Sequence, residues 1–214
     1  MTGPDSLRTT RAAFDAVAAD YAATFRDELA GRPLDRALLA AFAELAGGLG
    51  PIADLGCGPG HVTAHLSALG ADAFGVDLSP GMVAVARKAY PGLRFEEGSM
   101  TGLDLPDGGL GGVLAWYSIV NLPIEQLPAV FAEFRRVLLP GGHLLVAFQA
   151  GEEIRHATEW FGHELSLSLY RRPPELVAEL LAQAGFVLSA QLVRQPEEGS
   201  AERGPRAHLL ARTT

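Results

Sequence analysis

The sequence predicts a doubly wound α/β fold with a mostly parallel, seven-stranded sheet that ends in an antiparallel hairpin near the carboxyl terminus. Two observations indicate this class. Short, almost wholly apolar runs alternate with amphipathic stretches of about ten residues or more, which is typical of parallel strands covered by helices on both faces. A glycine-rich turn also joins the first apolar run to the helical stretch that follows it.

The first two elements are predicted as helices. Apolar residues at steps of three and four predict a helix over residues 5–30. A second helix is expected over 33–46, because Pro33 suits the first turn of a helix and a glycine pair beginning at Gly47 suits its end.

The rest of the chain alternates between strands and helices. Helices are expected over residues 60–69, 80–89, 125–138 and 173–184. Strands are expected over residues 51–55, 71–76, 93–96, 110–117, 142–148, 187–194 and 206–212. The last two strands should form the closing hairpin around an acidic turn at 196–204.

One segment breaks the alternation, and we expect it to be a lid over the carboxyl edge of the sheet. Residues 150–172 contain His156, Glu159, Trp160 and His163, which are spaced to share one face of a helix. The whole chain, 1–214, is predicted to be one domain that consists of an N-terminal helical cap (1–48), the sheet and this lid insertion.

Composition narrows the classes of function. The chain has 17 Lys and Arg against 25 Asp and Glu, a formal charge of -8, which disfavours a nucleic acid partner. It has one cysteine and therefore no internal disulfide. No run is long and apolar enough for a membrane span or a signal peptide. We expect a cytoplasmic protein without a membrane partner, either a monomer or a homodimer.

The glycine turn carries the strongest signal of chemistry. Asp54 lies near the end of the first predicted strand, and glycines at 56, 58 and 60 follow it. Glycine is required where the chain turns sharply and a ligand approaches the backbone. A dinucleotide-binding loop would have its third glycine where His61 stands, and its pyrophosphate would be repelled by the Asp54 carboxylate.

An acidic residue stands at the end of the next predicted strand. Asp77 follows Gly60 by 17 residues, and a carboxylate at this position suits the two hydroxyls of a ribose. The two motifs together therefore suit a ligand that carries a ribose, and Asp54 disfavours a pyrophosphate beside the loop.

Together these residues resemble the nucleotide-binding motifs of class I S-adenosylmethionine-dependent methyltransferases, in particular the ubiquinone-biosynthesis-like enzymes with a type 11 methyltransferase domain. The resemblance extends from residue 5 to the carboxyl terminus. Its other parts are the cap helix at 14–25, the loop at 97–100, the fourth-strand motif at 114–122 and the turn at 139–143. Ser99 stands where many relatives have Asp, and its hydroxyl can still accept a hydrogen bond from an exocyclic amine.

The resemblance implies S-adenosylmethionine as the cofactor and assigns residues to its parts. The glycine loop would hold the methionyl part, Asp54 its amino group, Tyr21 its carboxylate, and Asp77 the ribose. The residues expected to bind the cofactor are Tyr21, Asp54, Gly56, Cys57, Gly58, Gly60, Asp77, Leu78, Met82, Ser99, Met100, Ala115 and Trp116.

Methyl transfer from a sulfonium requires a general base only when the acceptor must lose a proton. The candidates for catalysis are His156, His163 and Tyr117, with Glu159 orienting a histidine ring. The candidates for substrate contact are Asn121, Trp160 and Tyr170. Many relatives have His at the position of Asn121, and an amide cannot act as a base at neutral pH. No metal site is predicted, because a third well-placed ligand is not evident.

Three functions are consistent with this pattern. The first is methyl transfer to an oxygen, nitrogen or carbon atom of a small molecule, for example a secondary metabolite. The second is a protein that binds S-adenosylmethionine without methylating. The third is an NAD-dependent oxidoreductase, against which His61 and Asp54 both argue.

Overall fold

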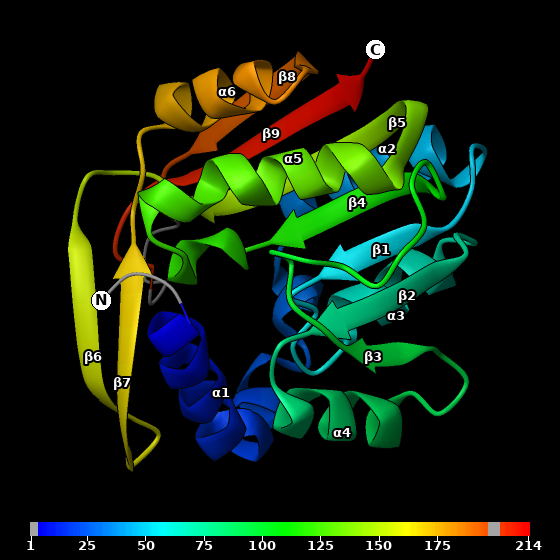
Figure 1. Cartoon of the computed structure of the whole chain (residues 1–214). Coiled ribbons are helices and arrows are strands. Elements are labelled where there is room, and N and C mark those ends of the chain that lie inside the picture. Colours follow the sequence, from blue (N-terminus) through cyan, green and yellow to red (C-terminus); the bar gives the residue numbers. More distant parts are fainter. Residues whose placement is uncertain (1–3, 197–201) are drawn as a thin grey trace.

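The computed structural model describes residues 4–196 and 202–214 (Figure 1). A seven-stranded sheet runs through the molecule in the order β3-β2-β1-β4-β5-β9-β8. Strand β9 is antiparallel to both of its neighbours, and the other pairs are parallel. The strands are β1 (Ile52–Leu55), β2 (Ala73–Asp77), β3 (Phe95–Glu97), β4 (Leu110–Trp116), β5 (Leu138–Gln149), β8 (Phe186–Arg194) and β9 (Arg206–Thr213). The predicted fold class is confirmed.

The central strands are buried along their whole length. All residues of β1 and β4 are buried, as expected for strands covered on both faces. Parallel pairing places the carboxyl ends of β1, β2 and β4 at one edge of the sheet. The loops that follow these three strands therefore lie close together.

Helices cover both faces of the sheet (Figure 1). On one face, α5 (Leu127–Val137) packs against β5 and α6 (Pro174–Gln183) against β8 and β9, and these helices contribute Phe131, Phe134 and Leu181 to one core. On the other face, α2 (Pro33–Gly47) and α3 (His61–Ala68) contribute Phe42 and Leu66 to a second core. The predicted cap is therefore divided, because α2 covers the sheet.

Helix α1 (Pro4–Phe25) crosses the carboxyl edge and packs against α4 (Pro80–Ala89) (Figure 1). The helix predicted over residues 5–30 ends at Phe25, and a short 3-10 helix follows at Glu28–Gly31. The residue before a proline is disfavoured in helical geometry, which explains the break before Pro33. Part of the predicted acidic turn, residues 197–201, lies outside the described residues.

The predicted helical face in the lid is wrong. Residues 150–172 form a β-hairpin of β6 (Ile154–Trp160) and β7 (His163–Tyr170), which lies beside α1 (Figure 1). Side chains alternate between the two faces of a strand, so the helical spacing of His156, Glu159, Trp160 and His163 does not place them on one face. Four residues at helical spacing within so short a segment are weak evidence for a helix.

Among the described residues, no helix is long and apolar enough to cross a membrane.

Gly111 offers a test of how closely the sheet packs on the turn after α2. A Cβ atom at Gly111 would lie 2.5 Å from the backbone nitrogen of Gly50 and 2.6 Å from the carbonyl oxygen of Ala46. Because backbone atoms cannot move aside, Gly111→Ala should lower the free energy of unfolding by about 1–3 kcal/mol in urea titrations. Gly92→Ala is the control, since no atom of the described residues lies within 4 Å of its Cβ position. Equal stability of both variants would contradict this packing.

Candidate functional site

The glycine loop connects β1 to α3 in a conformation that glycine favours. Gly56, Gly58 and Gly60 all have positive φ angles of 76°, 53° and 84°. A Cβ at Gly56 would lie 2.3 Å from Cβ of Ser118, whereas a Cβ at Gly58 would meet no atom of the described residues within 4 Å. Gly56 therefore allows two loops to approach, and Gly58 leaves room for a ligand against the backbone.

Asp77 holds this loop in place from the end of β2. Its Oδ2 accepts a hydrogen bond from the Gly58 backbone N–H and its Oδ1 from the Ser79 N–H, both at 2.8 Å. Burial raises the pKa of Asp77, and these two hydrogen bonds oppose the rise. Each carboxylate oxygen can accept a further hydrogen bond. The fixed carboxylate can thus receive two hydroxyls of a ligand.

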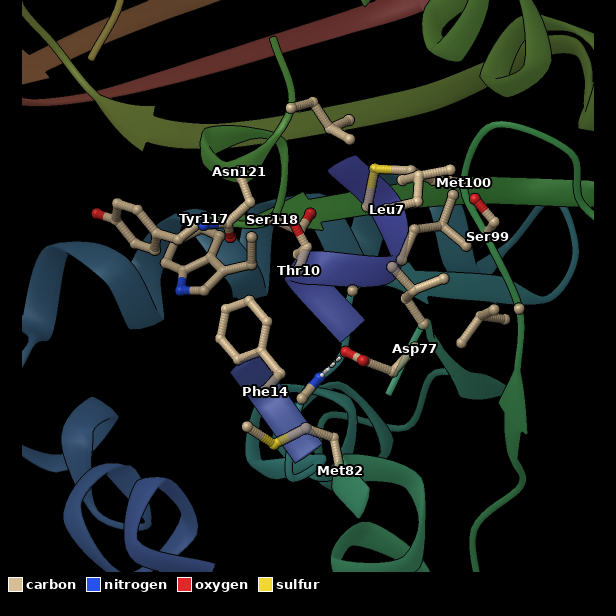
Figure 2. Close-up of a pocket in the computed structure, with 18 of the residues that line it drawn as sticks. Leu7, Thr10, Phe14, Asp77, Met82, Ser99, Met100, Tyr117, Ser118 and Asn121 are labelled. Carbon is tan, nitrogen blue, oxygen red and sulfur yellow. Dashed lines mark hydrogen bonds between the residues drawn. The ribbon is translucent and has the colours of Figure 1, made fainter. Parts of the chain in front are cut away.

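A pocket opens between this loop, helix α1 and the end of β4 (Figure 2). Its empty volume is about 770 Å³, including solvent at its mouth. We call it the first pocket. It is lined by Leu7, Thr10, Phe14, Tyr21, Leu55, Gly56, Gly58, Val76, Asp77, Leu78, Met82, Gly98, Ser99, Met100, Trp116, Tyr117, Ser118, Asn121 and Leu122.

Four residues predicted to bind the cofactor do not line this pocket: Asp54, Cys57, Gly60 and Ala115. Ala115 is a core residue of β4, and Gly60 packs against Phe95. Cys57 is buried under the loop, where burial raises the pKa of its thiol. Each of these three supports the fold beneath the pocket.

Asp54 lies behind the glycine loop and is only 1% exposed. Its Oδ2 accepts a hydrogen bond from the Thr63 hydroxyl at 2.7 Å, and its Oδ1 has no partner among the described residues. Burial raises the pKa of Asp54 to about 7, in spite of the Thr63 hydrogen bond. A buried acceptor without a partner is rare, and it fits a site whose ligand or water is needed to complete it.

Tyr117 directly follows β4 and lines both the first pocket and a neighbouring pocket that is described below. It has a positive φ angle of 54°, and its hydroxyl lies 3.5 Å from Nε2 of His208. Figure 2 shows this hydroxyl pointing away from Asp77. Burial raises the pKa of Tyr117, which disfavours the phenolate that a general base would require.

The loop after Tyr117 is tied to the lid hairpin. Asn121 donates from Nδ2 to the carbonyl oxygen of Ser168 at 3.2 Å. Arg172 is 3% exposed and donates to the carbonyl oxygens of Ile119 and Leu122. Burial lowers the pKa of Arg172 to about 10, so its guanidinium remains charged at neutral pH. These bonds fix the loop that carries Ser118 and Asn121.

The two histidines that were predicted to be catalytic lie on the hairpin, outside the first pocket. His156 is exposed and faces the hydroxyls of Ser166 and Ser168, each at 3.3 Å. His163 Nε2 lies 2.9 Å from Oδ2 of Asp20 on α1, where it joins the hairpin to the cap. Neither histidine lines the first pocket. Tyr170, a candidate for substrate contact, does not line it either, and the centre of its ring lies 5.2 Å from the Arg172 guanidinium.

The opposite face of the hairpin borders a second pocket. Its empty volume is about 1020 Å³, including open solvent, and it shares Phe14, Tyr21, Tyr117 and Asn121 with the first pocket. We call it the second pocket. Its other lining residues are Phe25, Glu28, Val120, Gln149, Arg155, Ala157, Glu159, Trp160, Leu169, Glu202 and Arg206.

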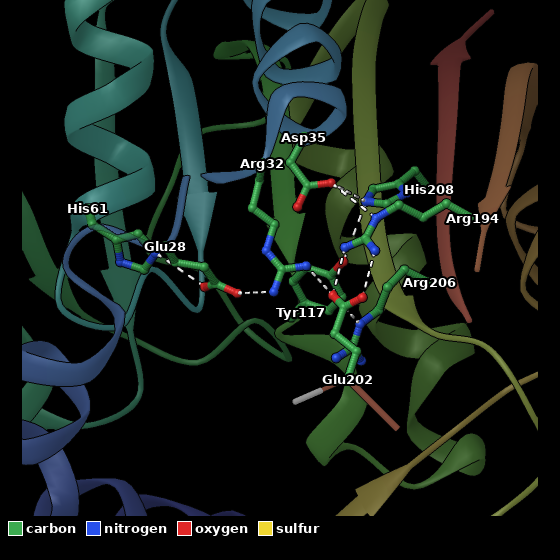
Figure 3. A network of polar contacts seen from close by, with 9 residues as sticks. All are labelled: Glu28, Arg32, Asp35, His61, Tyr117, Arg194, Glu202, Arg206 and His208. Atoms are coloured by element: carbon green, nitrogen blue, oxygen red, sulfur yellow. Dashed lines mark hydrogen bonds and ion pairs between the residues drawn. The ribbon is translucent and has the colours of Figure 1, made fainter. Parts of the chain in front are cut away.

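An ion-pair network lies beside the second pocket (Figure 3). Glu202 accepts hydrogen bonds from three arginines. Arg194 donates to each of its carboxylate oxygens at 2.7 Å, and Arg32 donates to Oε1. The Nε of Arg206 also donates to Oε1, at 3.3 Å. These hydrogen bonds, that of Arg194 above all, lower the pKa of Glu202 to about 2. Arg194 also approaches Asp35 at 3.5 Å. No pattern in the sequence indicated this network, because its members come from distant segments and only the fold brings them together.

The comparisons with known proteins agree with this geometry. A family model described as "Methyltransferase domain" matches residues 52–142. Demethylmenaquinone methyltransferase of Chlorobaculum parvum is 39% identical over 92 residues, which cover 42% of this chain and 37% of that protein. The chain thus matches less than two fifths of the length of this curated relative.

Two solved structures match almost the whole chain. The "DhpI-SAH complex structure" has a TM-score of 0.73 and 22% identity, and it covers 99% of this chain and 98% of its own. The "[4+2]-Cyclase SpnF" has a TM-score of 0.69 and 20% identity over 100% and 98% of the two chains. The resemblance to class I S-adenosylmethionine-dependent methyltransferases that the sequence predicted is confirmed, and residues 52–142 are the part of the chain that the family model matches.

The buried carboxyl of Asp54 predicts a pH dependence of stability. Its ordinary pKa is 3.8 and its folded pKa is about 7, so between these values the folded protein keeps a proton that the unfolded chain has lost. The free energy of unfolding should therefore fall as pH rises through this window. Asp54→Asn should flatten this slope and be more stable than the wild type at pH 8 by about 1–2 kcal/mol in urea titrations.

The control for this prediction is Asp72→Asn, because Asp72 is exposed just before β2. It should retain the slope of the wild type. An unchanged slope in Asp54→Asn would show that another group sets the pH dependence.

Proposed function

We propose that this chain binds S-adenosylmethionine in the first pocket and transfers its methyl group to a small molecule held in the second pocket. The observation that carries the proposal is the junction of the two pockets at Phe14, Tyr21, Tyr117 and Asn121. One pocket has the Asp77 carboxylate and the glycine loop that suit an adenosyl ligand. A donor and an acceptor in adjoining pockets can meet at this junction.

The residues that line the first pocket suit the parts of this donor. Asp77 would accept hydrogen bonds from the ribose hydroxyls, and Leu78 and Met82 would pack near the adenine. The hydroxyl of Ser99 and the side chain of Met100 would meet the adenine edge. The open backbone at Gly58 and the orphan oxygen of Asp54 support the placement of the methionyl part beside the loop. Tyr21 and Trp116 would close this end of the pocket.

The chain itself would contribute position and the exclusion of water. The donor supplies a methyl group that its sulfonium charge already activates. The acceptor atom would bond to the methyl carbon as the carbon–sulfur bond breaks, and a proton lost by the acceptor would pass to solvent. Phe14, Tyr21 and Trp160 pack edge to face above the junction and limit access of water. Alignment in such a site accounts for much of the rate of a displacement.

A second candidate function is binding of S-adenosylmethionine without methyl transfer. The neighbour titled as a [4+2]-cyclase has the same fold over the full chain, so the architecture alone does not fix the reaction. Formation of S-adenosylhomocysteine distinguishes the two functions. A cytoplasmic location, the absence of a nucleic acid partner and a monomeric or homodimeric state remain predictions from the sequence.

Calorimetric titration with S-adenosylmethionine, S-adenosylhomocysteine and NADH tests the donor. We expect both adenosyl ligands to bind with micromolar affinity and NADH not to bind. Binding of NADH alone would support an oxidoreductase instead. No binding of either adenosyl ligand would overturn the proposal.

Substitution of Asp77 tests the ribose contact. Asp77→Ala should weaken S-adenosylhomocysteine binding by about 1.5–3 kcal/mol, the range for the loss of hydrogen bonds to a charged group, as measured by calorimetry. Asp72→Ala is the matched control just before the opposite end of the same strand, and it should bind as the wild type does. Unchanged affinity of Asp77→Ala for S-adenosylhomocysteine would show that this carboxylate does not bind the ribose.

A further inference from the structure

The second pocket has one aromatic wall. Phe14, Tyr21, Phe25 and Trp160 line it, and their rings contact one another at centroid distances of 4.4–6.3 Å. These rings come from α1 and from the tip of the β6–β7 hairpin. Planar rings offer a large apolar contact area and favour offset or edge-to-face packing with another ring. The wall therefore suits a flat, apolar or aromatic molecule.

The charges of this pocket do not favour an anion. Its lining includes the carboxylates of Glu28, Glu159 and Glu202 and the guanidinium groups of Arg155 and Arg206. Arg206 forms an ion pair with Glu202, and its guanidinium also lies 5.4 Å from the centre of the Tyr117 ring. Arg155 is exposed and lies five residues from Trp160, roughly 16 Å along the strand.

The two remaining carboxylates lie near the aromatic wall. Glu159 is exposed and directly precedes Trp160. Glu28 lies 3.8 Å from Nη2 of Arg32 and 4.0 Å from Nε2 of His61. Burial lowers the pKa of His61 to about 4, so this ring is neutral and leaves Arg32 as the ionic partner of Glu28. Glu28 is therefore part of an ion pair, and a negatively charged ligand on the aromatic wall would meet the Glu159 carboxylate.

We propose that the second pocket binds an aromatic molecule without net negative charge, such as a phenol or an aromatic amine, with its ring packed on Trp160. A carboxylate on the ring should weaken binding, because it would lie near Glu159, which also lines the pocket, and like charges repel. The identification of this molecule as the methyl acceptor rests on the proposed function, whereas its binding does not.

Four probes test the proposal by ligand-observed NMR titration. p-Cresol, tyramine and 4-hydroxybenzoate share a phenol ring and differ in the charge of the para substituent, and citrate is a polyanion without a ring. The titrations use the protein with and without S-adenosylhomocysteine. We expect p-cresol and tyramine to bind and 4-hydroxybenzoate to bind at least about tenfold more weakly. Binding of citrate or 4-hydroxybenzoate as tight as that of p-cresol would overturn the proposal, as would the absence of p-cresol binding.

Variants locate the bound ring. Trp160→Leu should weaken p-cresol binding about tenfold, by loss of the aromatic contact. The matched control is Phe161→Leu, because Phe161 stacks on Trp160 with a centroid distance of 5.1 Å and does not line the pocket. Unchanged p-cresol binding in Trp160→Leu would place the ring elsewhere and overturn the proposal.

The charge of the pocket has a separate test. Glu159→Lys should narrow the difference in affinity between p-cresol and 4-hydroxybenzoate, and an unchanged difference would contradict the role of this carboxylate. Calorimetry with S-adenosylhomocysteine on every variant shows that the first pocket is intact. If the wild type binds the phenols but no adenosyl ligand, the proposed function fails and the second pocket still stands as a site for uncharged or cationic aromatic molecules.

Discussion

The hydrogen bonds that the Asp77 carboxylate accepts are the contacts on which the rest of the site depends. They join the turn after β1, through the Gly58 N–H, to the turn after β2, through the Ser79 N–H. Ser79 in turn caps α4 by accepting from the Met82 N–H, and its hydroxyl reaches Asp15 of helix α1. Asp77 thus joins two loops directly, and through Ser79 it is linked to the start of α4 and to helix α1. Its ligand-binding geometry is set before any ligand arrives, which lowers the entropic cost of binding.

The second pocket depends on a different principle, the alternation of side chains along a strand. Because β6 is extended, Arg155, Ala157 and Glu159 border the pocket, while His156 faces serines on the outer side of the hairpin. A bulge between Ala157 and Glu159 changes the register near the tip, where Trp160 reaches the rings of α1. The hairpin therefore supplies apolar and charged contacts to the pocket, and its two imidazoles lie elsewhere.

Much of the fold could be predicted from the sequence, since each signal was local. The apolar run at 110–117 predicted β4, and Pro80 with the periodicity after it predicted α4. The glycines at 56, 58 and 60 predicted a sharp turn, and all three have the positive φ angles that such a turn requires. The place of Asp77 in the site could be predicted because this residue stands at the end of a predicted strand. The lid was different, because a segment of about twenty residues with scattered aromatic and charged groups fits both helical and extended periods. The pairing of His163 with Asp20 and the contact of Trp160 with Tyr21 are long-range, and no local pattern encodes them.

The ion-pair network explains why so polar a region can border an apolar wall. Arg32, Arg194 and Arg206 face Glu28, Asp35 and Glu202, three charges of each sign. Burial lowers the pKa values of His61 and His208 to about 4, so neither histidine adds a charge at neutral pH. The desolvation of each ion is offset by its partners, and removal of any one would leave a charge uncompensated. A balanced network carries little field into the pocket. Glu159 stands outside it, beside Trp160, and therefore has a disproportionate effect on which ligand charges are accepted. The charge selectivity of the pocket thus arises at the hairpin tip, where the aromatic wall is also completed.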